Sequence, residues 1–216
     1  MKCIVFDFDG TLMDTGPGII AAAKYALAKH NIEDDEAKMG FFVGPPLLDS
    51  FMQHYGMSEE EAVQAVKDYR EYYRPIGIWN SRIYEGIPQL LDALTEHGFL
   101  CAVATSKPID LCRQLLEHEG ILSHFTVTCG TAGAEKDNLT KAELIAKAIR
   151  ECGCNADEAV MVGDTKFDIF GAKKCRVASV GAAYGYGSRE DLETAGADYI
   201  AESVNLLQDL LLSFKE

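Results

Sequence analysis

Two aspartates near the N-terminus are the first residues in the chain whose spacing suggests chemistry. They lie in the run Asp7-Phe8-Asp9-Gly10-Thr11, which continues an apolar stretch that begins at Cys3. In a parallel sheet such a run lies at the carboxyl end of a strand, where open α/β folds bind their ligands. Residues two apart on a strand point to the same side, so both carboxylates enter one cleft unless the chain bends between them. Two like charges that close together require a cation or a shared proton.

A second acidic pair follows a later apolar stretch. Val162-Gly163 leads into Asp164, and Asp168 comes four positions later, a spacing of one helical turn. If the two pairs converge, four carboxylates meet at one edge of the sheet. Oxygen ligands without Cys or His favour Mg²⁺ over zinc or copper. The sequence therefore predicts a site for a divalent cation, Mg²⁺.

Residues suited to binding an anion follow two other apolar stretches. Thr105-Ser106-Lys107-Pro108 offers hydroxyl and backbone N–H groups directly before a predicted helix, which suits a phosphate. Lys141, at the start of another predicted helix, adds a positive charge. Lys136, in a predicted loop, is the alternative to Lys141, but the start of a helix holds a side chain more firmly than a loop does. Lys107 is expected either to touch the substrate or to face solvent.

Short apolar runs rich in β-branched residues alternate with stretches of helical periodicity. This alternation predicts a parallel α/β sheet whose strands are buried on both faces. The predicted strands are Cys3–Phe8, Leu100–Thr105, Phe125–Cys129, Ala159–Val162 and Arg176–Val180. The predicted connecting helices are Gln89–His97, Ile109–Glu119, Thr140–Cys152, Phe167–Lys174, Glu190–Ala195 and Val204–Leu212.

One stretch, from about Gly16 to Tyr84, interrupts this alternation. Its apolar residues recur at helical spacing over Ile19–Ala28, Leu47–Tyr55 and Glu59–Tyr73, and Ser58 with Glu61 predicts a capping box. We therefore expect two domains, an α/β core of residues 1–15 and 85–216 and an inserted helical bundle of residues 16–84 that acts as a lid. Aromatic residues in the insertion are expected to pack together rather than to stack on a nucleobase; they are Tyr69, Tyr72, Tyr73 and Trp79.

In this order along the chain, the motifs resemble those of the haloacid dehalogenase-like superfamily of phosphatases. Asp7 to Thr11 matches its DxDGT motif, Thr105-Ser106 its second motif, Lys141 its third, and Gly163 to Asp168 its GDxxxD motif. The joint match is specific, whereas any one motif alone is weak. The resemblance implies a Rossmann-like parallel-sheet core, and the helical insertion looks like the cap of the phosphoglycolate phosphatase-like branch.

The resemblance also implies a role for each motif residue. Asp7 would be the nucleophile and would carry an aspartyl-phosphate, while Asp9 would act as general acid and then general base. The metal residues would be Asp7, Asp9 through its backbone carbonyl, Asp164, and Asp168, which orients a metal-bound water or Lys141. The phosphoryl oxygens would be bound by Thr105, by Lys141 and by the N–H groups of Phe8, Asp9 and Ser106.

The leading interpretation is an Mg²⁺-dependent phosphatase acting on a small phosphorylated metabolite. Phosphoglycolate and nucleoside 5′-monophosphates are the two substrate candidates, and both come from the resemblance. A sugar-phosphate mutase of the same family is a weaker alternative, and a dehalogenase would need neither Asp9 nor a metal. From a different class, a signalling module phosphorylated on aspartate also combines an acid cluster with a hydroxyl residue and a lysine.

Composition narrows the range of partners. The 216 residues contain 34 Asp and Glu against 20 Lys and Arg, a net charge of −14, which argues against nucleic acid or an acidic membrane as the main partner. Seven cysteines, an odd number, suit free thiols in a reducing compartment. No targeting segment is evident, so a cytoplasmic location is expected. The sequence leaves monomer and homodimer equally open.

Overall fold

The chain forms two compact units in the computed structural model, which describes residues 1–133 and 139–215. Unit 1 comprises Met1–Met13 and Ile83–Glu216, and unit 2 comprises Asp14–Arg82. The sequence predicts these two crossings after residues 15 and 84. Where the chain passes between the units, the short strands β2 (Met13–Asp14) and β3 (Arg82–Ile83) pair with each other.

Unit 1 is built on a six-stranded sheet in which every pairing is parallel. The strand order is β5-β4-β1-β6-β7-β8, so β1 lies near the middle and the chain order reverses beside it. The strands are β1 (Cys3–Phe6), β4 (Leu100–Pro108), β5 (Phe125–Thr131), β6 (Ala159–Gly163), β7 (Ala178–Ala182) and β8 (Tyr199–Ala201). The predicted Rossmann-like parallel α/β fold is therefore confirmed.

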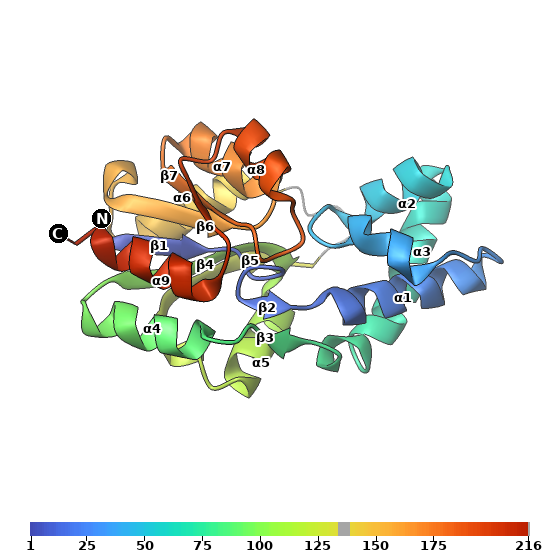
Figure 1. Ribbon diagram of the computed structural model, residues 1–216. Coiled ribbons are helices and arrows are strands. Elements are labelled where there is room, and N and C mark those ends of the chain that lie inside the picture. The colour runs from blue at the N-terminus through green and yellow to red at the C-terminus, as the bar shows by residue number, and fades with distance from the viewer. Residues whose placement is uncertain (134–138, 216) are drawn as a thin grey trace. The chain divides into compact units, whose positions relative to one another are not determined.

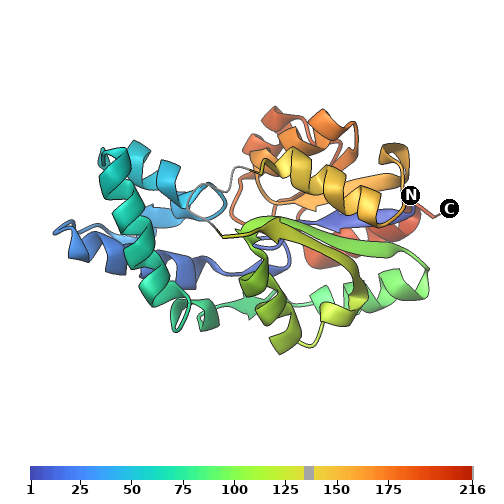
Figure 2. The same ribbon diagram turned by 180° about the vertical axis from the view of Figure 1, so that it is seen from behind.

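Helices cover both faces of this sheet (Figures 1 and 2). On one face lie α6 (Lys141–Glu151) and α7 (Lys166–Cys175), which pack against each other. On the other face lie α4 (Ile87–Glu96), α5 (Ile109–His118) and α9 (Val204–Ser213), with α4 against α9. Helix α8 (Arg189–Ala195) contacts β7 and β8, and η3 (Leu122–His124) and η4 (Ala156–Glu158) are short 3-10 turns.

The register of the central strands brings their carboxyl ends together. Phe6 is paired with Val103 of β4 on one side and with Val162 of β6 on the other. All four residues of β1 are fully buried, which agrees with the continuous apolar run because a strand covered on both faces has no solvent side. The chain that leaves β1 and β6 at this edge carries Asp7 and Asp164.

Several local features differ from the sequence-based prediction. Strand β1 ends at Phe6, so Asp7 and Asp9 follow the strand rather than continuing it. Strand β4 runs on to Pro108, beyond the end predicted at Thr105. Helix α7 begins at Lys166 after the N-cap Thr165, so Asp164 lies before the helix and is not one turn from Asp168 on the same helix. Strand β8 was not predicted.

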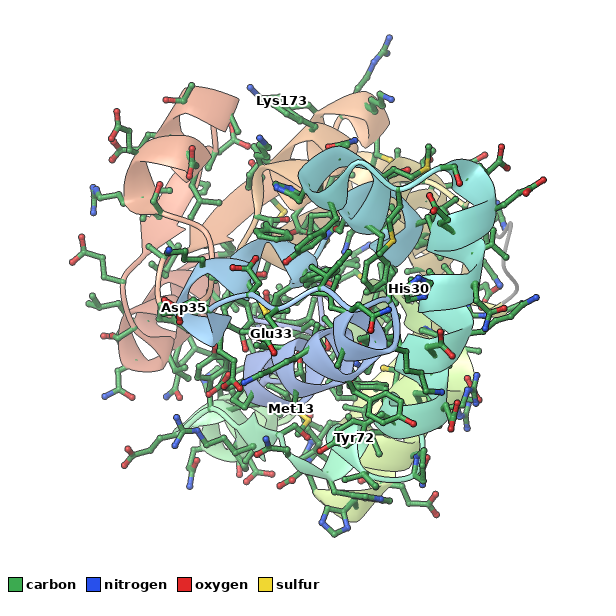
Figure 3. The ribbon with its side chains drawn as sticks, turned by 90° about the vertical axis from the view of Figure 1, so that its right-hand side faces the viewer. Met13, His30, Glu33, Asp35, Tyr72 and Lys173 are labelled. Carbon is green, nitrogen blue, oxygen red and sulfur yellow. The ribbon has the colours of Figure 1, made fainter. Side chains whose placement is uncertain are left out.

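Unit 2 is helical. It contains α1 (Gly16–Lys29), η1 (Glu36–Phe42), α2 (Leu47–Tyr55), α3 (Glu59–Tyr73) and η2 (Gly77–Trp79). Helix α1 packs along α3, where Lys29 contacts Asp68 at 3.1 Å and His30 lies 3.3 Å from the same carboxylate. Tyr72, labelled with His30 in Figure 3, stacks on Tyr25 with 5.2 Å between ring centroids.

Two local features of unit 2, a capping box and the packing of aromatic residues, agree with the sequence-based predictions. Ser58 and Glu61 form the predicted capping box at the start of α3. Tyr69 and Tyr73 are buried and stack on each other, as expected for packing, whereas Trp79 is 46% exposed. None of the helices that the structure describes has the length and apolar character needed to cross a membrane.

Helix α6 begins with a capping box that we expect to contribute to stability. The Thr140 hydroxyl accepts a hydrogen bond from the Glu143 N–H at 3.3 Å, and the Glu143 carboxylate accepts one from the Thr140 N–H at 2.8 Å. We predict that Thr140→Ala lowers the free energy of unfolding by about 1 kcal/mol, since the first turn loses a side-chain acceptor. Thr140→Ser keeps the hydroxyl and should stay near the wild type. Urea unfolding followed by circular dichroism measures both, and equal stability of the Ala and Ser variants would contradict the prediction.

Candidate active site

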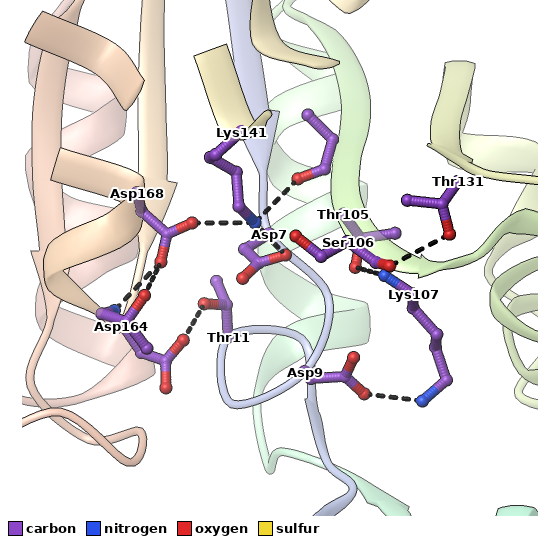
Figure 4. Close-up of polar contacts among 12 residues, drawn as sticks. Asp7, Asp9, Thr11, Thr105, Ser106, Lys107, Thr131, Lys141, Asp164 and Asp168 are labelled. Carbon is purple, nitrogen blue, oxygen red and sulfur yellow. Dashed lines mark hydrogen bonds and ion pairs between the residues drawn. The ribbon is translucent and has the colours of Figure 1, made fainter. Parts of the chain in front are cut away.

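Lys141 lies at the centre of the polar group at the carboxyl edge of the sheet (Figure 4). Its Nζ lies 2.8 Å from Oδ1 of Asp7 and 2.9 Å from Oδ1 of Asp168, and it donates to the backbone carbonyl of Ala104 at 3.3 Å. The lysine is the first residue of α6, so the capped helix start holds its backbone. One ammonium group thus joins β1, β4 and α7. The other candidate, Lys136, lies outside the described residues.

Asp168 connects this lysine to the start of α7. Its Oδ2 accepts hydrogen bonds from the Thr165 N–H at 3.0 Å and from the Thr165 hydroxyl at 2.8 Å. Its Oδ1 is the atom that contacts Lys141. Asp168 is fully buried: its Oδ2 is hydrogen-bonded to Thr165, whereas its Oδ1 has the ion pair with Lys141 and no hydrogen bond to the described part of the chain. Asp168 was predicted to orient either a metal-bound water or Lys141, and its ion pair with the lysine favours the second role.

Asp164 is held by two segments that are distant in sequence. The Thr11 hydroxyl donates to its Oδ1 at 3.2 Å, and the Tyr186 N–H donates to its Oδ2 at 2.9 Å. Tyr186 belongs to the turn after β7. Two glycines of this turn lie directly against the aspartate: a Cβ on Gly185 would be 2.4 Å from Asp164 Cβ, and one on Gly187 would be 2.0 Å from its carbonyl oxygen. No side chain fits at either position without displacing Asp164.

Three buried carboxylates meet at this point. One oxygen from each of Asp7, Asp164 and Asp168 lies within 4.8 Å of the other two. Burial raises the pKa of Asp7 to about 7, against the opposing effect of Lys141, and burial together with Asp168 and Asp7 raises the pKa of Asp164 well above its usual value. Burial alone would lower the pKa of Lys141, but the neighbouring carboxylates of Asp168 and Asp7 raise it.

This donor set fits a divalent cation. Three ionised carboxylates beside one ammonium leave an excess of two negative charges in a buried site, and such an excess is costly without a counter-charge. All the donors in the group are carboxylate oxygens, which are hard ligands of the kind that Mg²⁺ binds. The group of three residues is thus suited to the ion that the sequence predicted.

Asp9 departs from the prediction that four carboxylates converge. After β1 the chain turns back, with the Phe8 carbonyl accepting from the N–H groups of Leu12 and Met13 and with Gly10 at a φ of 77°. The Asp9 carboxylate is not part of the three-carboxylate group, and its Oδ1 contacts Lys107 Nζ at 2.9 Å. Because the chain bends between Asp7 and Asp9, their two carboxylates do not enter one cleft. Lys107 is buried, so it does not face solvent.

The predicted anion-binding segment lies on β4 beside Asp7. Thr105 is fully buried, and its hydroxyl accepts a hydrogen bond from the Lys107 N–H at 3.1 Å. Ser106 is exposed, and its carbonyl accepts from the Thr131 hydroxyl at 3.1 Å. Phe8 is fully buried next to Asp7. The structure therefore brings Thr105, Lys141 and Asp7 to one edge of the sheet, as the motif order predicted.

Some residues of the site had no assigned role from the sequence. Thr11 was identified only as part of a motif, yet it holds Asp164. Thr131, the last residue of β5, fixes the backbone at Ser106, and Tyr184 donates its hydroxyl to the Thr11 carbonyl at 3.0 Å. The position of Thr131 at the end of a strand could have indicated from the sequence that it lies at the site. Tyr184 had no comparable signal beyond its place in the Gly-rich turn.

Comparison with known proteins identifies the family. The model of the haloacid dehalogenase-like hydrolases matches residues 4–182. Among solved structures, one described as a predicted phosphatase from Clostridium acetobutylicum has a TM-score of 0.93 and 39% identity, covering 98% of each chain.

Curated relatives carry three different names. A protein of Pseudomonas aeruginosa named 5′-nucleotidase is 37% identical over 97% of this chain and 95% of its own length. The tyrosine-protein kinase PtkA of Mycobacterium tuberculosis is 31% identical over 95% of this chain and 70% of its own length. A phosphoglycolate phosphatase of Vibrio parahaemolyticus is 29% identical over 98% of this chain and 96% of its own length. With the family model spanning most of the chain and the buried acid-lysine group at the expected sheet edge, the chain belongs to the haloacid dehalogenase-like hydrolases.

Proposed function

We propose that this protein is a metal-dependent phosphatase that hydrolyses a small phosphomonoester by way of a phosphorylated Asp7. The observation that carries the proposal is the group of three buried carboxylates around Lys141, since it combines a candidate nucleophile, a cation site and a fixed positive charge. Phosphoryl transfer depends mainly on positioning and on stabilisation of charge on the transferred group. The three carboxylates and Lys141 could supply both the positioning and the charge stabilisation, because their neighbours hold these side chains in place.

In the first step, a carboxylate oxygen of Asp7 attacks the phosphorus atom. A bond from Asp7 to phosphorus forms, the ester P–O bond breaks, and the leaving oxygen takes a proton from the Asp9 carboxyl group. Lys141, Thr105 and the backbone N–H groups of Phe8, Asp9 and Ser106 would bind the phosphoryl oxygens. Lys141 can do so only from the place where Asp7 and Asp168 hold it, at 2.8 and 2.9 Å.

In the second step, water attacks the phosphorus atom of the aspartyl-phosphate. The bond between Asp7 and phosphorus breaks, inorganic phosphate leaves, and the water gives a proton back to Asp9. Asp7 and Asp9 thereby return to their starting forms. The same residue acts as acid in one step and as base in the next.

The cation would be held by the carboxylates of Asp7 and Asp164 and by the backbone carbonyl of Asp9, with Asp168 orienting Lys141 beside it. A bound Mg²⁺ would offset the repulsion between the Asp7 carboxylate and the phosphate and would stabilise negative charge on the transferred group. Thr11 and Tyr186 fix the Asp164 side chain from both sides, so that its oxygens are set before a cation binds.

The substrate that we favour is a small metabolite such as phosphoglycolate. Nucleoside 5′-monophosphates are the second candidate, and the Pseudomonas aeruginosa relative named 5′-nucleotidase supports them. That unit 2 acts as a lid that selects the substrate stays a prediction, based on its insertion in the chain between Asp9 and Thr105. A panel of phosphomonoesters that includes both candidates, assayed for inorganic phosphate with Mg²⁺, distinguishes them.

Product analysis separates hydrolysis from the competing reactions. A mutase would return isomerised sugar phosphate without free phosphate, and a signalling module would stay phosphorylated without turnover. The similarity to PtkA makes phosphate transfer to a protein tyrosine a third outcome to be measured in the same assay. Multiple turnovers to inorganic phosphate are the result that the proposed hydrolysis requires.

Removing the nucleophile should abolish turnover. We predict that Asp7→Asn lowers kcat by at least about 1,000-fold, because an amide oxygen cannot form the acyl-phosphate. Asp209→Asn, on the exposed side of α9, is the matched control and should retain wild-type kcat. Phosphate release under saturating substrate measures both. Substantial activity in the Asp7 variant would exclude the proposed nucleophile.

Chelation should stop the reaction reversibly. We expect EDTA to reduce phosphate release to background and added Mg²⁺ to restore it, since without the cation nothing offsets the repulsion between the Asp7 carboxylate and the phosphate. Preformed Mg-EDTA at the same concentration is the control for effects of the chelator itself. A rate that is unchanged by EDTA would contradict the cation site.

The turn that encloses Asp164 should set the affinity for the cation. Gly185→Ala places a Cβ 2.3 Å from the Gly10 carbonyl oxygen and 2.4 Å from Asp164 Cβ, so the turn and the aspartate must shift apart. We predict a loss of Mg²⁺ affinity of about 10- to 100-fold, measured directly by calorimetry in the absence of substrate. Gly40→Ala, with open space around the added Cβ, is the control and should bind Mg²⁺ as the wild type does. Unchanged affinity of the Gly185 variant would show that the turn does not position Asp164.

A further inference from the structure

Lys107 is a buried lysine on β4 that none of the family motifs assigns a role. Its side chain is 4% exposed, although lysine is rarely buried unless its charge is paired. Its Nζ lies 2.9 Å from Oδ1 of Asp9, whose side chain is 14% exposed, and 5.8 Å from the centre of the Phe8 ring. The ammonium group of Lys107 thus lies near both the Asp9 carboxylate and the ring of Phe8.

The backbone that carries Lys107 is fixed on two sides. Its N–H donates to the Thr105 hydroxyl at 3.1 Å, and the Thr131 hydroxyl on β5 holds the carbonyl of Ser106. Gly130 packs against the Lys107 carbonyl so closely that a Cβ there would be 2.7 Å from the oxygen. Lys107 therefore extends toward Asp9 from an irregular end of β4 whose backbone is hydrogen-bonded in place, whereas Asp9 lies in a turn.

The two lysines of the site contact different aspartates, three of the four in all (Figure 4). Lys141 contacts Asp7 and Asp168, and Lys107 contacts Asp9. The three-carboxylate group suited to a cation does not include the Asp9 carboxylate, which is turned toward β4. This division separates the side chain that would donate a proton from those that would hold the cation.

We propose that Lys107 is a positioning residue that holds the Asp9 side chain apart from the three-carboxylate group, so that Asp9 can reach the leaving oxygen of the substrate. The inference rests on the proposed function, in which Asp9 protonates that oxygen as the P–O bond breaks. Misplacement of a catalytic group by about 1 Å can cost about 100-fold in rate. A lysine that touches the phosphate itself would instead affect every substrate alike.

The test compares two leaving groups in Lys107→Met. An alkyl phosphate needs a proton on its departing oxygen, whereas p-nitrophenolate departs without one, and kcat/KM reports the steps up to that departure. We expect kcat/KM for the alkyl phosphate to fall about 100-fold and that for p-nitrophenyl phosphate to fall less than about 10-fold. Lys147→Met, an exposed lysine on α6, is the control and should leave both values unchanged. Equal losses with the two substrates, or no loss, would overturn the proposal.

A double-mutant cycle separates this proposal from the proposed function. Asp9→Asn should itself lose kcat/KM selectively with the alkyl phosphate; if it does not, the role of Asp9 fails whatever Lys107 does. In the Asp9→Asn background, Lys107→Met should cost less than about twofold, because the group that it positions is already disabled. A loss as large as in the wild-type background would overturn the positioning role. If Lys107→Met melts below the assay temperature, Lys107→Gln gives the same comparison with a polar side chain.

Discussion

A single ammonium group, that of Lys141, links the parts of the site that come from different elements. It lies within 2.9 Å of two buried aspartates, one after β1 and one on α7, and it also reaches the backbone of β4. Breaking a buried ion pair by removing one partner typically costs about 3 to 5 kcal/mol, since the remaining charge stays in an apolar surrounding. The contacts that would hold the lysine for a phosphate, under the proposed function, also link the elements at the sheet edge. Stability and chemistry therefore depend on the same few atoms.

The surrounding structure keeps these charges from rearranging. Asp168 accepts a hydrogen bond from Thr165, the N-cap of α7. Asp164 accepts one from Tyr186 and is enclosed by the Gly-rich turn after β7. Asp168 already forms an ion pair with Lys141 at 2.9 Å, and Gly185 and Gly187 pack directly against Asp164. Ionising all three carboxylates would therefore leave an excess of negative charge. Proton uptake by Asp7 or Asp164, whose pKa values are raised, relieves that excess, and so would a bound cation.

Much of this arrangement could be predicted from the sequence because it follows from periodicity and strand order. Buried parallel strands have continuous apolar runs, and the residues after them necessarily gather at one edge. The direction of Asp9 could not be predicted, because it depends on the turn in which the Phe8 carbonyl accepts three backbone hydrogen bonds. The burial of Lys107 was missed because β4 continues past Thr105, and strand β8 was missed because three residues, Tyr199 to Ala201, carry too little pattern.

The order of the chain has a consequence for how the protein folds. Strand β1 is made first, but its partners begin at Leu100 and Ala159, so it stays unpaired while the intervening chain is synthesised. Unit 2 is continuous in sequence and can fold in that interval. Pairing of β2 with β3 then brings Met13 and Ile83 together and shortens the effective loop between β1 and β4, which lowers the entropy lost when they pair. The insertion thus assists the assembly of the sheet that it interrupts in sequence.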